Sequence, residues 1–326
     1  MVWSSAPRNI ASMMPSTTAR ISGCVSGAGA GFAGACDFGF LGFTLMRACD
    51  AARGPSWQWL ATRRCYDPAM RTFRPCFTFL VLLALTGPAA AAERLPAGFV
   101  YLRDVDASIA QDMRYAGFDN FTGRPLPGYN APECVLRRAV AQVLAQVQAD
   151  LARENLSLKV YDCYRPTRAV RAFMRWANDG ARAAPTKRFF PALEKRTLFA
   201  SGYIATHSAH STGSAVDLTL IARPAAPAPP FDRSAAYGSC TGPVAQRAPD
   251  NSLDMGSGFD CFDARSHTSS GANTPAQQRW RALLVAAMRA RGLHNYFREW
   301  WHFSFGPRAG QGYDFPIGVR PPSTSP

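Results

Sequence analysis

The chain contains 326 residues and carries a formal net charge of +14, and its length allows one large domain or two ordinary ones. A basic balance alone does not favour nucleic acid. The sequence has no zinc-finger spacing, no phosphate-cradling glycine loop and no basic strip interleaved with aromatic residues, so we predict no nucleic-acid partner.

Residues 1–69 show little of the periodic patterning that marks a folded domain. Their most apolar part, residues 21–46, is rich in Gly, Ala and Ser and is interrupted by Asp37, which argues against a membrane span. We therefore expect no integral membrane anchor in the mature chain, and we interpret residues 1–69 as a non-native or disordered extension.

Residues 70–92 have the composition and order of a secretory signal peptide. Arg71 and Arg74 give a basic start, and an apolar run and four alanines follow before Glu93, as such signals require. Our hypothesis is that translation starts at Met70 and that the mature protein is exported, to the periplasm or outside the cell. The mature part keeps 28 basic and 19 acidic side chains, a net charge of +9, so it could associate with anionic wall polymers.

The mature chain begins with alternating strand and helix patterns. Residues 99–106 indicate an early strand, and an amphipathic helix is predicted from about residue 132 to residue 155. Leu156–Tyr161 is then a short apolar strand. The apolar stripe of the helix consists of Val140, Leu144, Val147 and Leu151.

Arg165 lies between this strand and a predicted helix over residues 167–178, which Pro166 opens because proline is well tolerated there. Strand-to-helix junctions present side chains to clefts, where a guanidinium can bind a carboxylate or stabilise an oxyanion. The alternative is an ordinary ion pair with Asp162. The apolar side chains of this helix that we expect in the core are Val170, Phe173, Met174 and Trp176.

The segment from Ser208 to Leu220 places an imidazole and a carboxylate seven residues apart across a glycine-containing turn. Residues 215–220 alternate as in a strand with one buried face, and Asp217 lies on its polar side. The small residues of the turn allow the His210 ring to fold back toward Asp217. We interpret this pair as two ligands of a divalent cation, whereas most such pairs are surface polar residues or hydrogen-bond partners.

Residues 222–232 are rich in proline, which prevents regular structure and marks a surface excursion. Together with the loop between Cys240 and Cys261, this excursion could form a rim or lid of the site. A third helix is predicted over residues 275–291 and ends at Gly292. Its apolar side consists of Trp280, Leu283, Leu284, Ala287 and Met288.

A third metal ligand is available near the C-terminus, in the segment Glu299–His302. His302 completes a His, Asp, His set, and catalytic zinc takes three protein ligands of this kind while keeping a fourth position for water. Glu299 is then a spare carboxylate able to act as general base and acid. Residues three apart lie on opposite faces of a regular strand, so we place Glu299 in the turn before the final strand. Residues 319–326 are expected to be a disordered tail.

Four of the nine cysteines lie in the inferred mature part, an even number in a compartment where disulfides persist. Three pairings are possible. We favour Cys134 with Cys163, and Cys240 with Cys261, each of which would stabilise the fold by about 3 kcal/mol. Four buried thiols are the alternative.

Six elements of the sequence resemble the zinc D-alanyl-D-alanine dipeptidases, peptidase family M15, which include the vancomycin-resistance dipeptidase and its periplasmic relatives. They occur in the family's order between residues 112 and 303, and an ordered match of this kind is hard to obtain by chance. The elements are Asp112–Ala116, Asp119–Gly123, Tyr164–Pro166, Ser208–Thr219, Asp254–Gly256 with Phe259–Asp260, and Glu299–Phe303.

The resemblance implies a catalytic zinc site with one ion per chain. In it, His210, Asp217 and His302 are the zinc ligands and Glu299 is the general base and acid. Arg165 stabilises the tetrahedral intermediate. Each of these five positions holds the residue type that the chemistry requires.

The resemblance also implies that Tyr115, Ser208 and Asp254 hold the substrate. Because a free dipeptide is a zwitterion, its pocket needs an acceptor for the ammonium group as well as donors for the carboxylate. We expect Asp254 to be that acceptor.

We expect residues 93–318 to form one α+β domain, in which a small antiparallel sheet carries the zinc site and helices pack against it. The resemblance implies the fold of the zinc D,D-carboxypeptidases and the hedgehog signalling domain, and hydrolysis of D-alanyl-D-alanine to free D-alanine. Two alternatives stay open: a D,D-carboxypeptidase acting on peptidoglycan stem peptides, and a non-catalytic, zinc-stabilised wall-binding module. Glu299 disfavours the module, because a structural zinc site needs no general base. The oligomeric state stays open.

Overall fold

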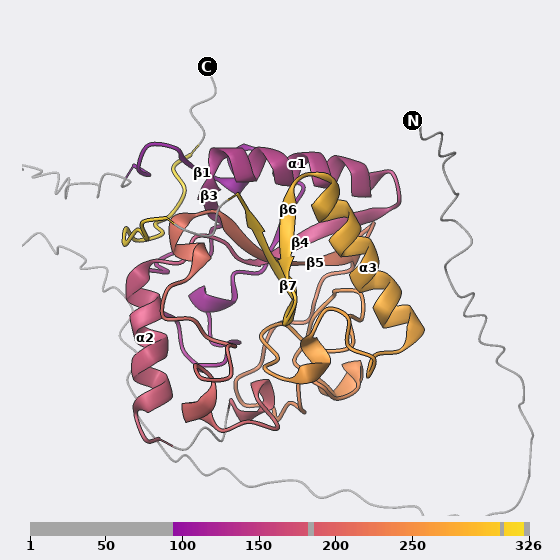
Figure 1. Cartoon of the computed structure of the whole chain (residues 1–326). Coiled ribbons are helices and arrows are strands. Elements are labelled where there is room, and N and C mark those ends of the chain that lie inside the picture. The colour runs from indigo at the N-terminus through magenta and orange to yellow at the C-terminus, as the bar shows by residue number, and fades with distance from the viewer. Residues whose placement is uncertain (1–93, 182–185, 307–309, 323–326) are drawn as a thin grey trace, which may run out of the picture. The chain divides into compact units, whose positions relative to one another are not determined.

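The computed structural model describes residues 94–181, 186–306 and 310–322 (Figure 1). The expected extension, the expected signal peptide and the end of the expected tail, residues 323–326, lie outside the described residues. Within the described residues, three α-helices and two sheets form a mixed α/β fold. No helix in this part of the chain is both long and apolar enough to cross a membrane.

A five-stranded sheet lies at the centre of the fold, with strand order β2-β4-β5-β7-β6. Strands β4, β5, β7 and β6 pair antiparallel as expected, but β2 runs parallel to β4. The sheet is therefore mixed, because the chain passes from β2 to β4 through a long helical crossover, as parallel neighbours require. The strands are β2 (Ala110–Gln111), β4 (Leu156–Asp162), β5 (Ala215–Ala222), β6 (Leu293–Tyr296) and β7 (Glu299–Phe305).

The first helix is shorter than its apolar pattern predicts, and α1 spans Arg138–Ala152. Part of its expected start is strand β3 (Val135–Arg137), which pairs antiparallel with β1 (Phe99–Tyr101) in a two-stranded sheet. The cause is tertiary: the backbone carbonyl of Val135 accepts a hydrogen bond from the Tyr164 amide at 2.8 Å. Pairing of this kind overrides local helix propensity.

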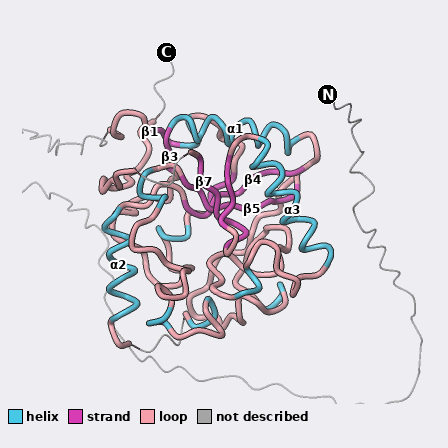
Figure 2. The backbone as a smooth tube through the Cα atoms, in the orientation of Figure 1, coloured by secondary structure: helices cyan, strands magenta, loops and turns pink. Residues whose placement is uncertain are grey.

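Helices α1 and α3 (Pro275–Ala290) pack against the sheet and against each other. In Figure 2 they lie above and to the right of the strands, while α2 lies on the left. The capping side chain of α3 is Thr274, whose hydroxyl accepts from the Gln277 amide at 3.3 Å. The buried apolar core between α1, α3 and the sheet includes Leu144, Val147, Leu218, Leu220, Leu284 and Met288.

Helix α2 spans Thr167–Asn178 as predicted. Its buried face carries Val170, Phe173 and Ala177, which recur every three or four residues as a helix requires. Met174 was expected in the core, but it is 38% exposed. The full buried face also includes Ala169, Ala172 and Trp176 and is therefore centred near Phe173, and Met174, one residue later, is turned by about 100° away from that centre.

Both favoured disulfides are present, Cys134–Cys163 and Cys240–Cys261. The first joins the residue before β3 to the residue after β4, and the second closes the loop that follows β5. The predicted surface excursion over residues 222–232 is confirmed except at its first residue, which still belongs to β5, and residues 223–230 are exposed and irregular.

Two methionines allow a matched test of the core. Replacing Met288, which is fully buried, by alanine is expected to lower the free energy of unfolding by about 2–5 kcal/mol, because a cavity remains. Met174→Ala should cost less, about 0.5 kcal/mol, since that side chain is 38% exposed and does not belong to the buried core. Urea unfolding measures both, and similar losses in the two variants would contradict the assigned core.

Candidate metal centre

The sheet brings the three predicted ligand residues together. Asp217 on β5 lies directly opposite His302 on β7 in the antiparallel register, and the His302 Nδ1 atom is 3.0 Å from Asp217 Oδ1. His210 Nε2 is 3.2 Å from the same oxygen and 3.0 Å from His302 Nδ1. Three potential ligand atoms from distant parts of the chain thus face one another at one point.

His210 reaches this point from a short 3-10 helix, Ala209–Thr212, immediately before β5. Gly213 ends that helix with φ of +77°, a conformation that glycine adopts without strain. A Cβ atom at Gly213 would lie 2.3 Å from the Phe99 ring. The sharp turn that folds the imidazole back toward Asp217 therefore needs glycine at this position.

The hydrogen bonds of His210 define its tautomer. Its Nδ1 atom lies 2.7 Å from the backbone carbonyl of Cys163, which can only accept. Nδ1 therefore carries the proton, and Nε2 directs a lone pair toward Asp217 and His302. Histidines that bind a metal through one ring nitrogen typically donate a hydrogen bond from the other nitrogen in this way.

The distances between the three atoms fit a cation with tetrahedral coordination. Ligand atoms bound to zinc at its usual distances lie about 3.3 Å apart, close to the 3.0–3.2 Å found here. Without a cation or a proton between them, facing lone pairs on two nitrogens and a carboxylate would repel. The donor set, two imidazoles and one carboxylate, is one that a divalent metal ion prefers.

The protonation states favour metal binding. Burial opposes ionisation of Asp217, but His210 and His302 outweigh it and hold the pKa of that carboxyl well below its usual range. Burial also lowers the pKa of His302. A deprotonated carboxylate and a neutral imidazole are the forms that bind metal.

Arg165 makes the ion pair considered from the sequence and also faces the metal centre. Its Nε atom donates to Asp162 Oδ2 at 2.8 Å, and its Nη2 atom is 3.6 Å from Asp217 Oδ2. The guanidinium lies over the rings of Tyr115 and Phe173. Burial disfavours its charge, but Asp162 together with Tyr115, Tyr129 and Asp217 outweighs burial and raises the pKa of Arg165 well above its usual range, so it stays positively charged.

Glu299 is the first residue of β7, not part of the preceding turn as expected. Asn295 pairs with Phe303 and the next residue, Tyr296, pairs with Glu299, so β7 bulges between these positions. The bulge brings Glu299 Oε2 to 4.0 Å from His302 Nδ1. Burial, followed by the charges of Asp217 and Asp260, raises the pKa of Glu299 well above its usual range.

A cavity of about 220 Å³ opens beside these residues. Tyr115 and Ser208, the predicted substrate-binding residues, line it, and the Ser208 hydroxyl accepts a hydrogen bond from the His210 amide at 3.3 Å. Residues 202–205, residues 207–209 and Tyr296 also line it. No residue of the proline-rich excursion lines the cavity, so that part of the predicted rim was wrong.

Asp254, the expected ammonium acceptor, does not line this cavity. Its carboxylate accepts from Arg247, from the Gly256 amide and from Gln277 at 2.7–3.1 Å, in a different depression. Asp260 lines the cavity instead, although no role was assigned to it from the sequence. Asp260 belongs to the motif Phe259–Asp260, which the sequence analysis had identified. The motif alone did not show whether the carboxylate of Asp254 or that of Asp260 faces the cavity.

The Asp260 side chain is nearly buried, with 4% of its surface exposed. Among the described residues its carboxylate receives one hydrogen bond, from the Tyr115 hydroxyl at 2.8 Å. Burial, and then the charge of Asp217, raise the pKa of Asp260 well above its usual range. A buried carboxyl with a single donor is suited to a cationic ligand group.

Comparison with known proteins gives a consistent result. The family model for peptidase M15, described as D-ala-D-ala dipeptidase, matches residues 96–227 and 233–317. A D-alanyl-D-alanine dipeptidase of Enterococcus faecalis is 33% identical over 206 residues, 63% of this chain and 90% of the relative. Those of Enterococcus faecium and Streptomyces coelicolor are 31% and 32% identical over 222 and 221 residues, 68% and 67% of this chain and 98% of each relative.

The raised pKa of Glu299 predicts a pH-dependent stability for the metal-free protein. At a pH below 4.5, the ordinary pKa of a glutamate carboxyl, Glu299 is protonated in the folded and in the unfolded protein. Folding then does not bury a charge at this position. As the pH rises, the unfolded chain ionises while the folded protein retains the proton, and stability is lost. The variant Glu299→Gln lacks this loss, so its stability relative to wild type should increase with pH.

Urea unfolding in the presence of a chelator, from acid to neutral pH, measures this difference. Glu154→Gln is the matched control, because its side chain is exposed. A Glu299→Gln effect that stays constant with pH, or that decreases as pH rises, would show that Glu299 is not held in a raised-pKa environment.

Proposed function

The chain belongs to the D-ala-D-ala dipeptidase family of peptidases, and from this premise we propose that it is a zinc-dependent dipeptidase that hydrolyses D-alanyl-D-alanine to free D-alanine. One observation carries the proposal: His210, Asp217 and His302 converge at about 3 Å beside Glu299 and Arg165, in a single cavity. A wall-binding module would not need a buried acid next to its metal ligands.

The metal would be held by His210, Asp217 and His302. When bound, zinc supplies polarisation of the scissile carbonyl and a water of lowered pKa. Glu299 is the proton carrier, because its raised pKa allows it to accept a proton from water and to return that proton to the departing amine at neutral pH.

Arg165 provides the positive charge for the developing oxyanion. It is fixed by Asp162 on one side and by the Tyr115 and Phe173 rings below, so little reorganisation accompanies the reaction. Donors held in place in this way stabilise the transition state more than the ground state.

Asp260 is the acceptor for the substrate's ammonium group in this proposal, in place of Asp254. The pairing would favour ionised Asp260 and offset the cost of its burial. The substrate carboxylate in this proposal accepts from the Ser208 hydroxyl, which lines the same cavity. A cavity of about 220 Å³ that contains both partners is suited to a small zwitterion.

We also propose that the protein acts in the periplasm or outside the cell. The two disulfides support this, because such bonds persist mainly in oxidising compartments.

The catalytic assignment is tested by D-alanine release from D-alanyl-D-alanine. Glu299→Gln should lower kcat by at least about 100-fold, because the proton carrier is lost, while metal analysis shows one zinc ion still bound. Chelation should abolish wild-type activity and zinc should restore it. Cleavage of a stem pentapeptide in preference to the dipeptide would instead indicate a carboxypeptidase.

The two aspartates give a matched test of ammonium recognition. Asp260→Asn should raise KM for the free dipeptide about 10- to 100-fold, since a charge-assisted hydrogen bond is lost. Asp254→Asn should change KM by less than about threefold, the scatter expected of a residue outside the cavity. Steady-state kinetics of both variants measure this, and the opposite ranking would restore Asp254 as the acceptor.

A further inference from the structure

Asp260 has an unusual backbone conformation for its residue type. Its φ angle is +55°, in the left-handed region, which aspartate tolerates better than most non-glycine residues but which still costs free energy that the surrounding structure must offset. The same backbone angle directs the carboxylate into the cavity beside Tyr115. What holds this conformation therefore controls whether the carboxylate is available to a ligand.

Cys240 holds the backbone on both sides of Asp260. Its sulfur is bonded to Cys261, the next residue, and its carbonyl accepts from the Gly258 amide at 2.9 Å, two residues earlier. The intervening Phe259 stacks on Tyr161 of β4, with ring centroids 4.5 Å apart. Asp260 thus lies within a short segment that is attached at each end to one residue, Cys240.

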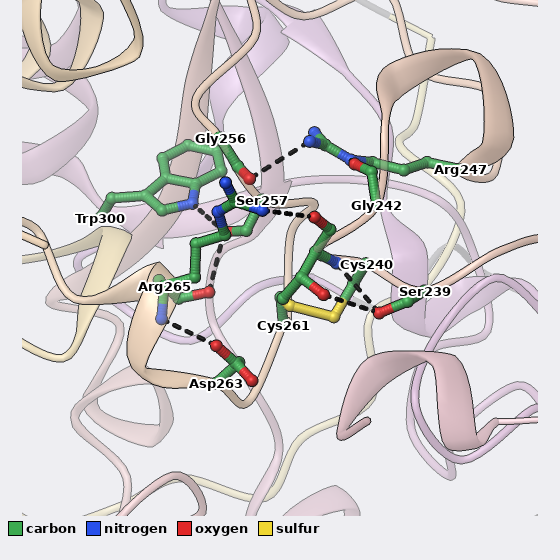
Figure 3. Close-up of a disulfide and its surroundings, with 12 residues drawn as sticks. Ser239, Cys240, Gly242, Arg247, Gly256, Ser257, Cys261, Asp263, Arg265 and Trp300 are labelled. Atoms are coloured by element: carbon green, nitrogen blue, oxygen red, sulfur yellow. Dashed lines mark hydrogen bonds between the residues drawn. A yellow bond between two sulfur atoms is a disulfide. The ribbon is translucent and has the colours of Figure 1, made fainter. Parts of the chain in front are cut away.

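Cys240 is itself well anchored. Its amide donates to the Arg188 carbonyl at 2.9 Å, and the Phe262 amide donates to the neighbouring Phe189 carbonyl at 2.7 Å. Figure 3 shows the disulfide joining the segment of Ser239 and Cys240 to the segment of Cys261 and Asp263. Cys240 and Cys261 are therefore tied to the same short stretch of the chain.

Two arginines support the segment that follows Cys240. Arg265 donates to the Thr241 carbonyl at 2.8 Å, and Arg247 donates to the Gly242 carbonyl at 2.7 Å. Both arginines lie beside the disulfide in Figure 3. When the disulfide is intact, the anchored backbone of Cys240 therefore fixes the position of the segment that contains Asp260.

The Cys240–Cys261 disulfide lies outside the cavity and away from the candidate metal ligands. Neither Cys240 nor Cys261 lines the cavity, and neither lies among the hydrogen-bond partners of His210 or His302. Loss of the bridge should therefore act through Asp260 and leave the metal ligands unchanged.

We propose that the Cys240–Cys261 disulfide is a positioning element for ammonium recognition. It holds Asp260 in the conformation that presents its carboxylate to the cavity, and so it sets the preference for dipeptides with a free amino group over N-blocked ones. This inference rests on the proposed function, since it takes D-alanyl-D-alanine as the ligand.

The test measures binding rather than turnover, in the zinc-loaded full chain carrying Glu299→Gln. Calorimetry gives the Kd values of D-alanyl-D-alanine and of N-acetyl-D-alanyl-D-alanine, with and without Cys240→Ser/Cys261→Ser. The Kd of the free dipeptide should rise at least about 10-fold, the scale of a lost charge-assisted contact, while that of the acetylated dipeptide changes less than about twofold.

A double-mutant cycle identifies the route of the effect. If the bridge acts through Asp260, adding Cys240→Ser/Cys261→Ser to Asp260→Asn should cause no further loss of preference. The bridge control is Cys134→Ser/Cys163→Ser, which removes the other disulfide. Because the Cys163 carbonyl contacts His210, any loss in this variant should weaken the free and the acetylated dipeptide equally and leave the preference unchanged. Additive effects in the cycle, or equal losses for both ligands when the Cys240–Cys261 bridge is removed, would overturn the proposal.

Two further measurements keep the outcomes distinct. If the serine pair does not fold, Cys240→Ala/Cys261→Val replaces it, because buried cysteines behave as small apolar groups. D-alanine release by wild type tests the function separately. Wild type that cleaves the dipeptide while the bridge-free variant keeps its preference overturns this inference alone, and wild type that binds neither ligand overturns both.

Discussion

The structure depends on one electrostatic constraint: a carboxylate and two imidazole nitrogens face one another at about 3 Å beside the cavity. Without a cation this arrangement is unfavourable, so other parts of the fold must hold it. The antiparallel register of β5 and β7 fixes Asp217 against His302. The Cys163 carbonyl fixes the ring of His210. The central sheet thus supports a candidate cation site.

Around this site, carboxyl groups of similar chemistry have different pKa values and therefore different charges. Asp217 is held ionised by the two histidines, whereas burial keeps Glu299 and Asp260 prone to protonation. Arg165 balances Asp162 beneath the cavity. Divergent pKa values among neighbouring carboxyls can separate their roles, and the proposed mechanism uses this difference: Asp217 would bind metal, Glu299 would move a proton and Asp260 would meet a positively charged ligand group. The environment of each carboxyl, and not its residue type, determines its role.

The sequence was informative where periodicity or motif order constrains a residue. Strand alternation placed Asp217, and family resemblance joined it to the distant C-terminal pair. The sequence was not sufficient where the pairing of distant strands or the direction of a loop determines the position of a residue. Val135–Arg137 lies within a helical pattern but forms a strand because β1 pairs with it, and a bulge in β7 carries Glu299 to the side of His302. Asp254 and Asp260 look alike in sequence, and only the path of a disulfide-closed loop shows that Asp260 faces the cavity.

The partner of His210 Nδ1 has an evolutionary consequence, because it is a backbone carbonyl and not a side chain. Every amino acid supplies that oxygen, so exchange of the residue at position 163 does not remove the acceptor. The tautomer of a metal-ligand candidate is thereby robust to substitution at its own contact point. It is sensitive instead to changes that shift the main chain at the end of β4, which include insertions, deletions and loss of the bridge from Cys163 to Cys134.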